Sequence, residues 1–185
     1  MPNHLKIKPF QETLNAGMCG PASLKILLSY YGIEKSEEEL ADLCGTKKDL
    51  GTDDQGIKRA AESLGFKVEI KNNSSFSDIE EWLDKNAPVI VNWFTCGNAG
   101  NKDFCSLQSD VPDGHYSVVC GIDDEFIYLQ DPEIGKIRKI KKNDFERVWF
   151  DFSGELIKPD ELIIRQMIAV YPWITKYLQK PVSWK

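Results

Sequence analysis

The first half of this chain contains several sequence patterns that start helices. This feature does most to limit the folds that the chain can adopt. A capping box pairs a Ser or Thr side chain with the backbone three residues later, where a Glu or Gln bonds back. The spacing occurs at Ser36–Glu39, Thr52–Gln55 and Ser77–Glu80. A further helix is predicted over about Pro21–Tyr31, where apolar residues recur at helical spacing before Gly32. The N-terminal half is therefore predicted to be helical.

The second half carries strand patterns instead. It opens on a short apolar run, continues with two segments that form a hairpin around Asp123-Asp124-Glu125, and ends on two further strands. A polar, glycine-containing loop over residues 95–114 is of the kind that borders a site. Helices followed by an antiparallel sheet predict an α+β fold, with the helices on one side, in a single domain over residues 1–185. The predicted strands are Val89–Trp93, His115–Ile122, Phe126–Asp131, Lys136–Ile140 and Leu162–Tyr171, with a short helix over Asn143–Phe150.

Charge and composition exclude several classes of protein. The net charge is −6, and no basic run could neutralise phosphates, so we expect no nucleic-acid partner. Two histidines leave little room for a multi-histidine metal centre, and we expect neither metal nor cofactor. No apolar stretch approaches the ~20 residues that span a bilayer, and the start lacks a signal peptide's apolar core. These features predict a cytoplasmic protein with no transmembrane segment and free thiols.

One of the five cysteines stands at a helix start. Cys19 precedes the helix that Pro21 helps to begin, because proline suits a first turn. The unpaired N–H groups and the dipole at a helix start stabilise a thiolate, which is the nucleophilic form of cysteine. The small neighbours Gly20 and Ala22 leave room for a substrate. The alternative is a buried structural cysteine.

His115 and Asp131 can meet on the hairpin. A three-residue turn over Asp123–Glu125 would pair Ile122 with Phe126, and Asp131 would then be the diagonal neighbour of His115 on one face. A two-residue turn would send Asp131 to the opposite face. With the longer turn, the carboxylate could orient the imidazole, and His115 could serve Cys19 as base and acid. The alternatives are a structural histidine and a plain strand-ending turn.

A nucleophile also needs donors for the oxyanion that develops on the substrate. The Cys19 backbone N–H is one candidate, and a side-chain amide upstream would be the second. Gln11 is the first choice and Asn15 a rival, although Asn15 is also typical of a loop residue that bonds its own backbone.

The segments around these residues, in this order, resemble the bacteriocin-processing, double-glycine leader peptidase family over about residues 8–150. The resemblance implies a papain-like fold with Cys19 as nucleophile, His115 as base and acid, Asp131 as orienting residue and Gln11 as oxyanion donor. Gln11 stands eight residues before Cys19, whereas the family usually has six. The chain resembles the stand-alone members, because it carries neither a membrane span nor a nucleotide-binding loop. The matching segments are Gln11, Met18–Leu24, Leu28–Gly32, Gly51–Thr52 with the helix to Gly65–Phe66, Pro88–Val91, Gly114–Val119 and Asp131–Pro132.

The remaining features fit structural roles. Cys96 and Cys105 lack the spacing and histidines of a zinc site, and Cys44 and Cys120 are predicted in the core. The basic run Lys136–Lys142 is interpreted as a solvated strand face.

Three functions follow as hypotheses. The first is a cysteine peptidase that hydrolyses a peptide or small amide through a Cys19 thioester. The second is an acyltransferase, transglutaminase-like or peptide-condensing, in which an amine intercepts the same thioester. The third is a catalytically idle module that binds a peptide, although a binder would not need Cys19, His115 and Asp131 together.

Overall fold

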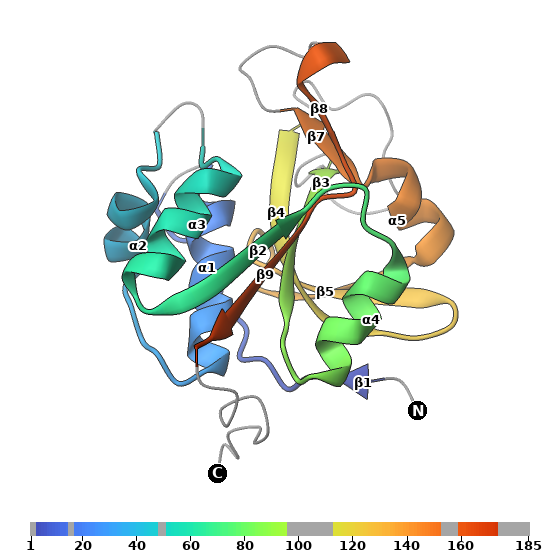
Figure 1. Ribbon diagram of the computed structural model, residues 1–185, viewed down its shortest axis with the longest axis horizontal. Coiled ribbons are helices and arrows are strands. Elements are labelled where there is room, and N and C mark those ends of the chain that lie inside the picture. The colour runs from blue at the N-terminus through green and yellow to red at the C-terminus, as the bar shows by residue number, and fades with distance from the viewer. Residues whose placement is uncertain (1–2, 15–16, 48–50, 96–112, 153–158, 174–185) are drawn as a thin grey trace.

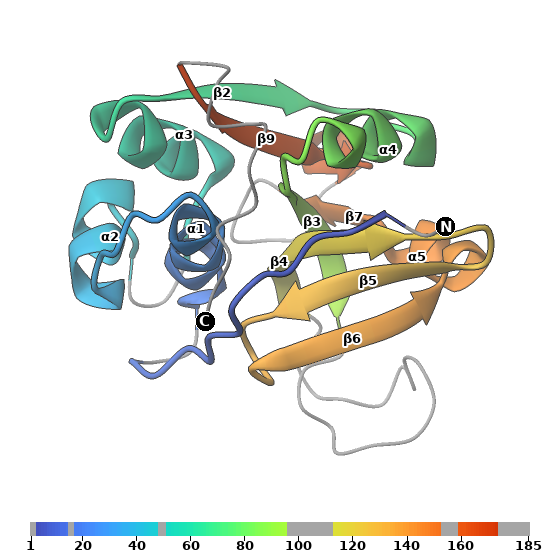
Figure 2. The same ribbon diagram turned by 90° about the horizontal axis from the view of Figure 1, so that it is seen from below.

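An antiparallel sheet forms the centre of the computed structural model, which describes residues 3–14, 17–47, 51–95, 113–152 and 159–173. The sheet has seven strands in the order β2-β9-β3-β4-β5-β6, with β1 paired to β4, as Figure 2 shows from below. Helices α1, α2 and α3 gather on one side of it, and α4 and α5 lie on the other (Figure 1). The predicted α+β class is confirmed, but the helices cover both faces.

The elements follow the predicted order with few additions. The helices are α1 (Cys19–Tyr30), α2 (Glu37–Cys44), α3 (Asp54–Ser63), α4 (Phe76–Asp84) and α5 (Lys142–Val148), with a 3-10 turn over Pro159–Glu161. The strands are β1 (Asn3–His4), β2 (Phe66–Lys71), β3 (Val89–Thr95), β4 (Asp113–Ile122), β5 (Phe126–Asp131), β6 (Lys136–Lys141), β7 (Phe150–Phe152), β8 (Leu162–Ile164) and β9 (Met167–Pro172). Within the described ranges, no helix has both the length and the apolar character needed to cross a membrane.

Side-chain caps start α2, α3 and α4, and two of these three helices begin where the sequence did not place them. The box at Ser36–Glu39 is confirmed, because each side chain bonds the other's backbone N–H. Helix α3 is capped by Asp53, whose carboxylate accepts from the N–H of Gly56, so the box predicted at Thr52–Gln55 is wrong. Aspartate is as good a cap as threonine, and the spacing alone does not choose between adjacent candidates.

Helix α4 begins two residues earlier than predicted. Its box joins Ser75 to Asp78, so the box predicted at Ser77–Glu80 is wrong. The earlier start makes Phe76 the first helical residue, and its ring lies 5.7 Å from that of Trp149. Tertiary packing of this aromatic side chain accounts for the choice of cap.

The predicted last strand is divided. Arg165 has a φ of 47°, in the left-handed region, and this turn separates β8 from β9. Strand β9 then pairs with both β2 and β3. Strand β2 was not predicted, although Phe66–Lys71 alternates apolar and charged residues, which is the pattern of a half-buried strand.

Two apolar cores lie on the two faces of the sheet. One joins α1, α2 and α3 to strand residues such as Ile90 and Val118, and the other joins α4 and α5 to residues such as Val119 and Leu129. Strand β4 is therefore buried on both faces. His115 lies on the second of these faces and is 5% exposed, although the sequence indicated a less apolar face there.

The hairpin between β4 and β5 has the shorter of the two turns considered. The N–H of Asp123 donates to the carbonyl of Phe126 at 2.9 Å, which closes a two-residue turn. Ile122 pairs with Ile127, so the predicted three-residue turn is wrong. With this turn alone, the side chain of Asp131 would lie on the face opposite His115.

A β-bulge at Cys120 returns the side chain of Asp131 to the face that carries His115, as predicted. Beyond it Val119 pairs with Leu129, which is the pairing that the three-residue turn would have given. A bulge adds one unpaired residue to one strand and so reverses the alternation of all residues that follow. His115 and Asp131 consequently share a face, as predicted, but through a different backbone route.

Candidate active site

Cys19 is the first residue of helix α1. The N-cap, Met18, makes no side-chain capping bond, and its carbonyl accepts the first helical N–H, from Ala22, at 2.9 Å. The N–H groups of the first turn lack helical acceptors, and they favour negative charge beside the half-buried Cys19. The helix start is two residues earlier than predicted, but Cys19 keeps the predicted position at its N-terminal end.

The helix that carries Cys19 is fixed to the strand that carries His115. The hydroxyl of Ser23, one turn along α1, donates to the carbonyl of Tyr116 at 3.0 Å, and Ser23 is fully buried. Tyr116 directly follows His115 in β4. A Cβ on Gly20 would lie 2.8 Å from the Cβ of Thr52, so only glycine fits here without a shift.

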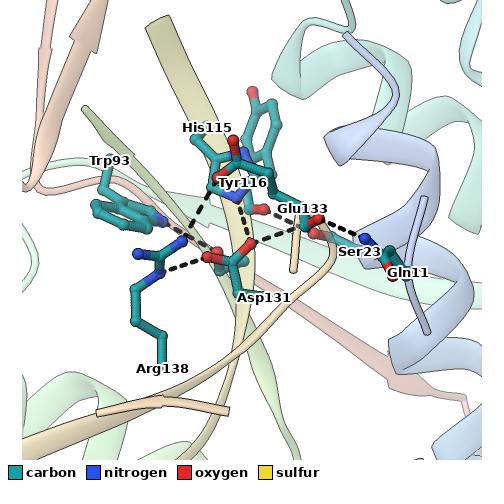
Figure 3. Close-up of polar contacts among 9 residues, drawn as sticks. Gln11, Ser23, Trp93, His115, Tyr116, Asp131, Glu133 and Arg138 are labelled. Carbon is teal, nitrogen blue, oxygen red and sulfur yellow. Dashed lines mark hydrogen bonds and ion pairs between the residues drawn. The ribbon is translucent and has the colours of Figure 1, made fainter. Parts of the chain in front are cut away.

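The imidazole of His115 lies between Cys19 and Asp131. Its Nε2 is 2.7 Å from Oδ1 of Asp131 (Figure 3). Cys19 also interacts with this imidazole, and because Asp131 occupies Nε2, Nδ1 is the ring nitrogen left for the thiol. The ring of Trp93 packs edge-on against the imidazole at 5.6 Å between centroids. The structure thus brings together three of the four predicted site residues.

The surroundings of His115 favour its charged form. Burial by itself lowers the pKa of the imidazole, but the hydrogen bonds to Asp131 and Cys19, and the negative charge on both, raise the pKa to about 10. The ring therefore holds its second proton at neutral pH.

Three donors hold the carboxylate of Asp131, which is fully buried at the end of β5. Oδ1 accepts from His115 and, at 2.9 Å, from the N–H of Glu133, while Oδ2 accepts from Nε of Arg138 at 2.6 Å. Burial raises the pKa of this carboxyl, but the hydrogen bonds and charges of His115 and Arg138 outweigh burial and hold it below its usual value.

Arg138 was missed by the sequence analysis, which placed the run Lys136–Lys142 on a solvated face. In β6, Arg138 lies opposite Leu129, so it shares a face with Asp131, two residues further along β5. The register of this second hairpin was the signal that could have identified it.

Gln11 is not brought to Cys19 by the contacts that the structure describes. It is exposed, its amide donates to the carbonyl of Glu133 at 3.1 Å, and its Cβ lies close to Gly135 (Figure 3). The rival donor, Asn15, lies outside the described residues.

Glu12 is a second side chain that the sequence analysis missed. Its N–H donates to the carbonyl of Pro132 at 2.9 Å, beside Asp131, and its buried Oε2 has no hydrogen-bond partner among the described residues. Burial raises the pKa of this carboxyl to about 7, against the attraction of His115 and with the repulsion of Glu133, Glu37 and Asp131. An isolated glutamate in a loop gives no signal of such burial.

His115, Asp131 and Glu133 offer atoms of metal-ligand type within 4.8 Å of one another. The guanidinium of Arg138 already contacts both carboxylates, at 2.6 Å for Asp131 and 3.5 Å for Glu133. A metal ion would therefore have to displace Arg138.

The other described cysteines are chemically unlike Cys19. Cys44 and Cys120 are buried and free, as predicted, and burial raises the pKa of their thiols to about 12 and about 11. Both stay protonated at neutral pH, and the thiol is not the nucleophilic form. Cys96 and Cys105, with most of the predicted loop, lie outside the described residues.

A helix-borne cysteine beside a buried His–Asp pair on an antiparallel sheet is the arrangement of papain-like cysteine peptidases. The model of the Peptidase_C39 like family matches residues 4–157, and the chain belongs to that family. The family resemblance inferred from the sequence is confirmed, and membership supports a cysteine peptidase-like hydrolase.

Its relatives include domains of larger proteins. The chain is 30% identical over 141 residues to the lactococcin-G-processing and transport ATP-binding protein LagD of Lactococcus lactis. The matched region covers 76% of this chain but only 17% of LagD. It is 31% identical over 142 residues to an uncharacterized protein of Methanothermobacter thermautotrophicus, covering 75% of the chain and 79% of that protein.

Solved structures share the fold. The peptidase domain of Streptococcus ComA, a bifunctional ABC transporter involved in quorum sensing, superposes with a TM-score of 0.62 at 25% identity, covering 89% of this chain and 98% of that domain. A putative C39-like peptidase from Bacillus anthracis gives 0.65 at 18% identity, over 92% and 97% of the two chains. The predicted papain-like fold is thus confirmed.

Proposed function

We propose that this protein is a cysteine peptidase that cleaves a peptide bond through a thioester on Cys19. His115 is the general acid and base, and Asp131 orients its ring. The observation that carries the proposal is the position of one buried imidazole, which bonds Asp131 through Nε2 and also interacts with Cys19.

The charge state of this arrangement suits each step. The Cys19 thiolate attacks the carbonyl carbon of the substrate, and the first-turn N–H groups of α1 stabilise the oxyanion. His115 gives its proton to the leaving amine, since the raised pKa keeps that proton on the ring at neutral pH. His115 then takes a proton from the water that hydrolyses the thioester.

A peptide is the substrate class that the relatives support. LagD is a lactococcin-processing protein, and another fold neighbour, at 22% identity, is described as a double glycine motif protease in complex with a leader peptide. We therefore propose a peptide with a Gly-Gly pair before the scissile bond as the first substrate to test.

The experiment combines a thiol-directed activity probe with cleavage of a peptide library, on wild type and Cys19→Ala. We expect the probe to label Cys19 ahead of Cys44 and Cys120, and Cys19→Ala to abolish cleavage while the protein stays folded. Wild-type cleavage by Cys19→Ala would contradict the proposal. Product masses with added amines separate hydrolysis from acyl transfer.

The second oxyanion donor is tested in the same assay. If Gln11 leaves Glu133 to contact the substrate, Gln11→Ala lowers kcat by roughly 10²–10³-fold, the range for loss of one oxyanion donor. An unchanged kcat leaves the backbone N–H groups as the donors.

A further inference from the structure

Arg138 is the charged side chain that completes the surroundings of Asp131. Oδ1 of this fully buried carboxylate is taken by His115 and the N–H of Glu133, and Oδ2 accepts from Nε of Arg138 at 2.6 Å. Without Arg138, Oδ2 would lose the only partner described for it. An unpaired buried charge is costly, and a carboxyl responds by taking a proton or by turning away.

The side chain of Arg138 is itself held in place. Its guanidinium lies 5.7 Å from the ring centroid of Trp93, and Nη2 contacts Oε2 of Glu133 at 3.5 Å (Figure 3). The indole N–H of Trp93 donates to the hydroxyl of Ser117 at 3.1 Å, which fixes the ring under the guanidinium. The side chain is 30% exposed, so most of it is removed from water.

The sheet aligns these groups across four neighbouring strands. Trp93 pairs with His115, and the registers place Asp131 and Arg138 on the same face of β5 and β6. The four side chains therefore come from consecutive strands of the sheet. The indole comes from β3, the imidazole from β4, the carboxylate from β5 and the guanidinium from β6. Each member is set by backbone pairing rather than by a loop, which favours a fixed geometry.

We propose that Arg138 is a positioning residue, which acts on His115 by keeping Asp131 charged and turned toward Nε2. The inference rests on the proposed peptidase function. Arg138 does not contact the reacting atoms, so its effect reaches the reaction through the orientation and tautomer of His115.

The pH dependence of activity follows from the charges around Asp131. Burial raises the pKa of Asp131, while His115 and Arg138 lower it. The carboxylate of Glu133 contacts Arg138, and the half-buried Glu12 becomes charged only as the pH rises to about 7. Removing the guanidinium therefore raises the pKa of Asp131. Because Asp131 must be ionised to hold His115, the acidic limb of the rate profile moves to higher pH.

The test compares Arg138→Met and Arg138→Lys with Lys139→Met as control. Lys139 is an exposed residue of the same strand that pairs with Tyr128 on the opposite face from Asp131, so its loss removes the same charge away from the carboxylate. We expect Arg138→Met to lower kcat by about 10- to 100-fold, as for loss of an oriented base, with KM nearly unchanged. The kcat of Arg138→Lys should lie between those of wild type and Arg138→Met. Added guanidinium ions should partly restore the kcat of Arg138→Ala.

Two results would overturn the inference. One is an Arg138→Met profile that matches Lys139→Met in kcat and in its acidic limb. The other is a loss of kcat with no shift of that limb and no rescue by guanidinium, which indicates a structural role only. If Arg138→Met fails to fold, Arg138→Lys and the rescue of Arg138→Ala decide by the same criteria.

A readout without substrate separates this inference from the proposed function. The chain has two histidines, so ¹⁵N signals of the His115 ring can be assigned against those of His4. We expect Arg138→Met, but not Lys139→Met, to shift the Nε2 signal of His115. Unchanged signals would contradict the positioning role of Arg138 even if Cys19→Ala had confirmed the peptidase. Shifted signals would support that role even if no peptide were cleaved.

Discussion

The carboxyl of Glu12 couples protonation to folding near neutral pH. Burial raises its pKa from an ordinary value of 4.5 to about 7 in the folded protein. Between these two pH values the folded chain keeps a proton that the unfolded chain releases. The contribution of Glu12 to stability is therefore greatest below pH 4.5 and falls as the pH rises to about 7.

Glu12→Gln should remove this dependence, because an amide does not titrate. We expect the free energy of unfolding of Glu12→Gln, relative to wild type, to increase from pH 5 to pH 8. Urea denaturation at several pH values measures it, and the exposed Glu69→Gln is the control for loss of a charge. A difference that stays constant with pH would contradict the assignment.

Residues at element boundaries could be predicted from the sequence, and those defined by packing could not. Cys19 begins a helix and Asp131 ends a strand, so local patterns indicated both. Arg138 belongs to the site because of the register between β5 and β6, and Glu12 because of burial beside Pro132. Neither condition is visible in the neighbouring sequence.

Among the elements, helix α1 and strand β4 pack in one core and are also joined by a buried hydrogen bond, from Ser23 to the carbonyl of Tyr116. Ser23→Ala removes this bond from a buried carbonyl and should cost about 0.5–1.5 kcal/mol of unfolding free energy. It should also lower kcat, because Cys19 and His115 are then less firmly aligned.

Ser29→Ala is the matched control, since Ser29 is also buried in α1 but donates to Ile26 of the same helix. Denaturation and kinetics on both variants check the prediction. Equal kcat values would show that the link between the two elements does not align the site.

The bulge explains why the prediction placed Asp131 on the correct face although it gave the hairpin the wrong turn length. The prediction counted residues from Asp123–Glu125 and reached the right face for Asp131. The structure has one residue fewer in the turn and one more in the strand, at Cys120. The alternation of side chains shows only whether two residues share a face of the sheet. It therefore cannot distinguish a three-residue turn from a two-residue turn followed by a bulge.

At the scale of the whole molecule, the second core supports the face that carries His115 and Asp131. Phe145 is fully buried there, 6.1 Å from Trp93 and 5.3 Å from Trp149 between ring centroids. We expect Phe145→Ala to lower the free energy of unfolding by about 3–5 kcal/mol. The exposed Leu43→Ala should stay within about 0.5 kcal/mol, and urea denaturation compares them. A loss under 1 kcal/mol for Phe145→Ala would show that this core is not needed.

The candidate site takes Cys19 from the first helix and its other members from strands in the second half of the chain. During synthesis, Cys19 is added to the chain well before His115, Asp131 and Arg138. At ordinary elongation rates the interval is roughly 5 to 25 seconds. Under the proposed function, the newborn chain carries a thiol without its base, and proteolytic activity begins only after translation has delivered the last strand of the site.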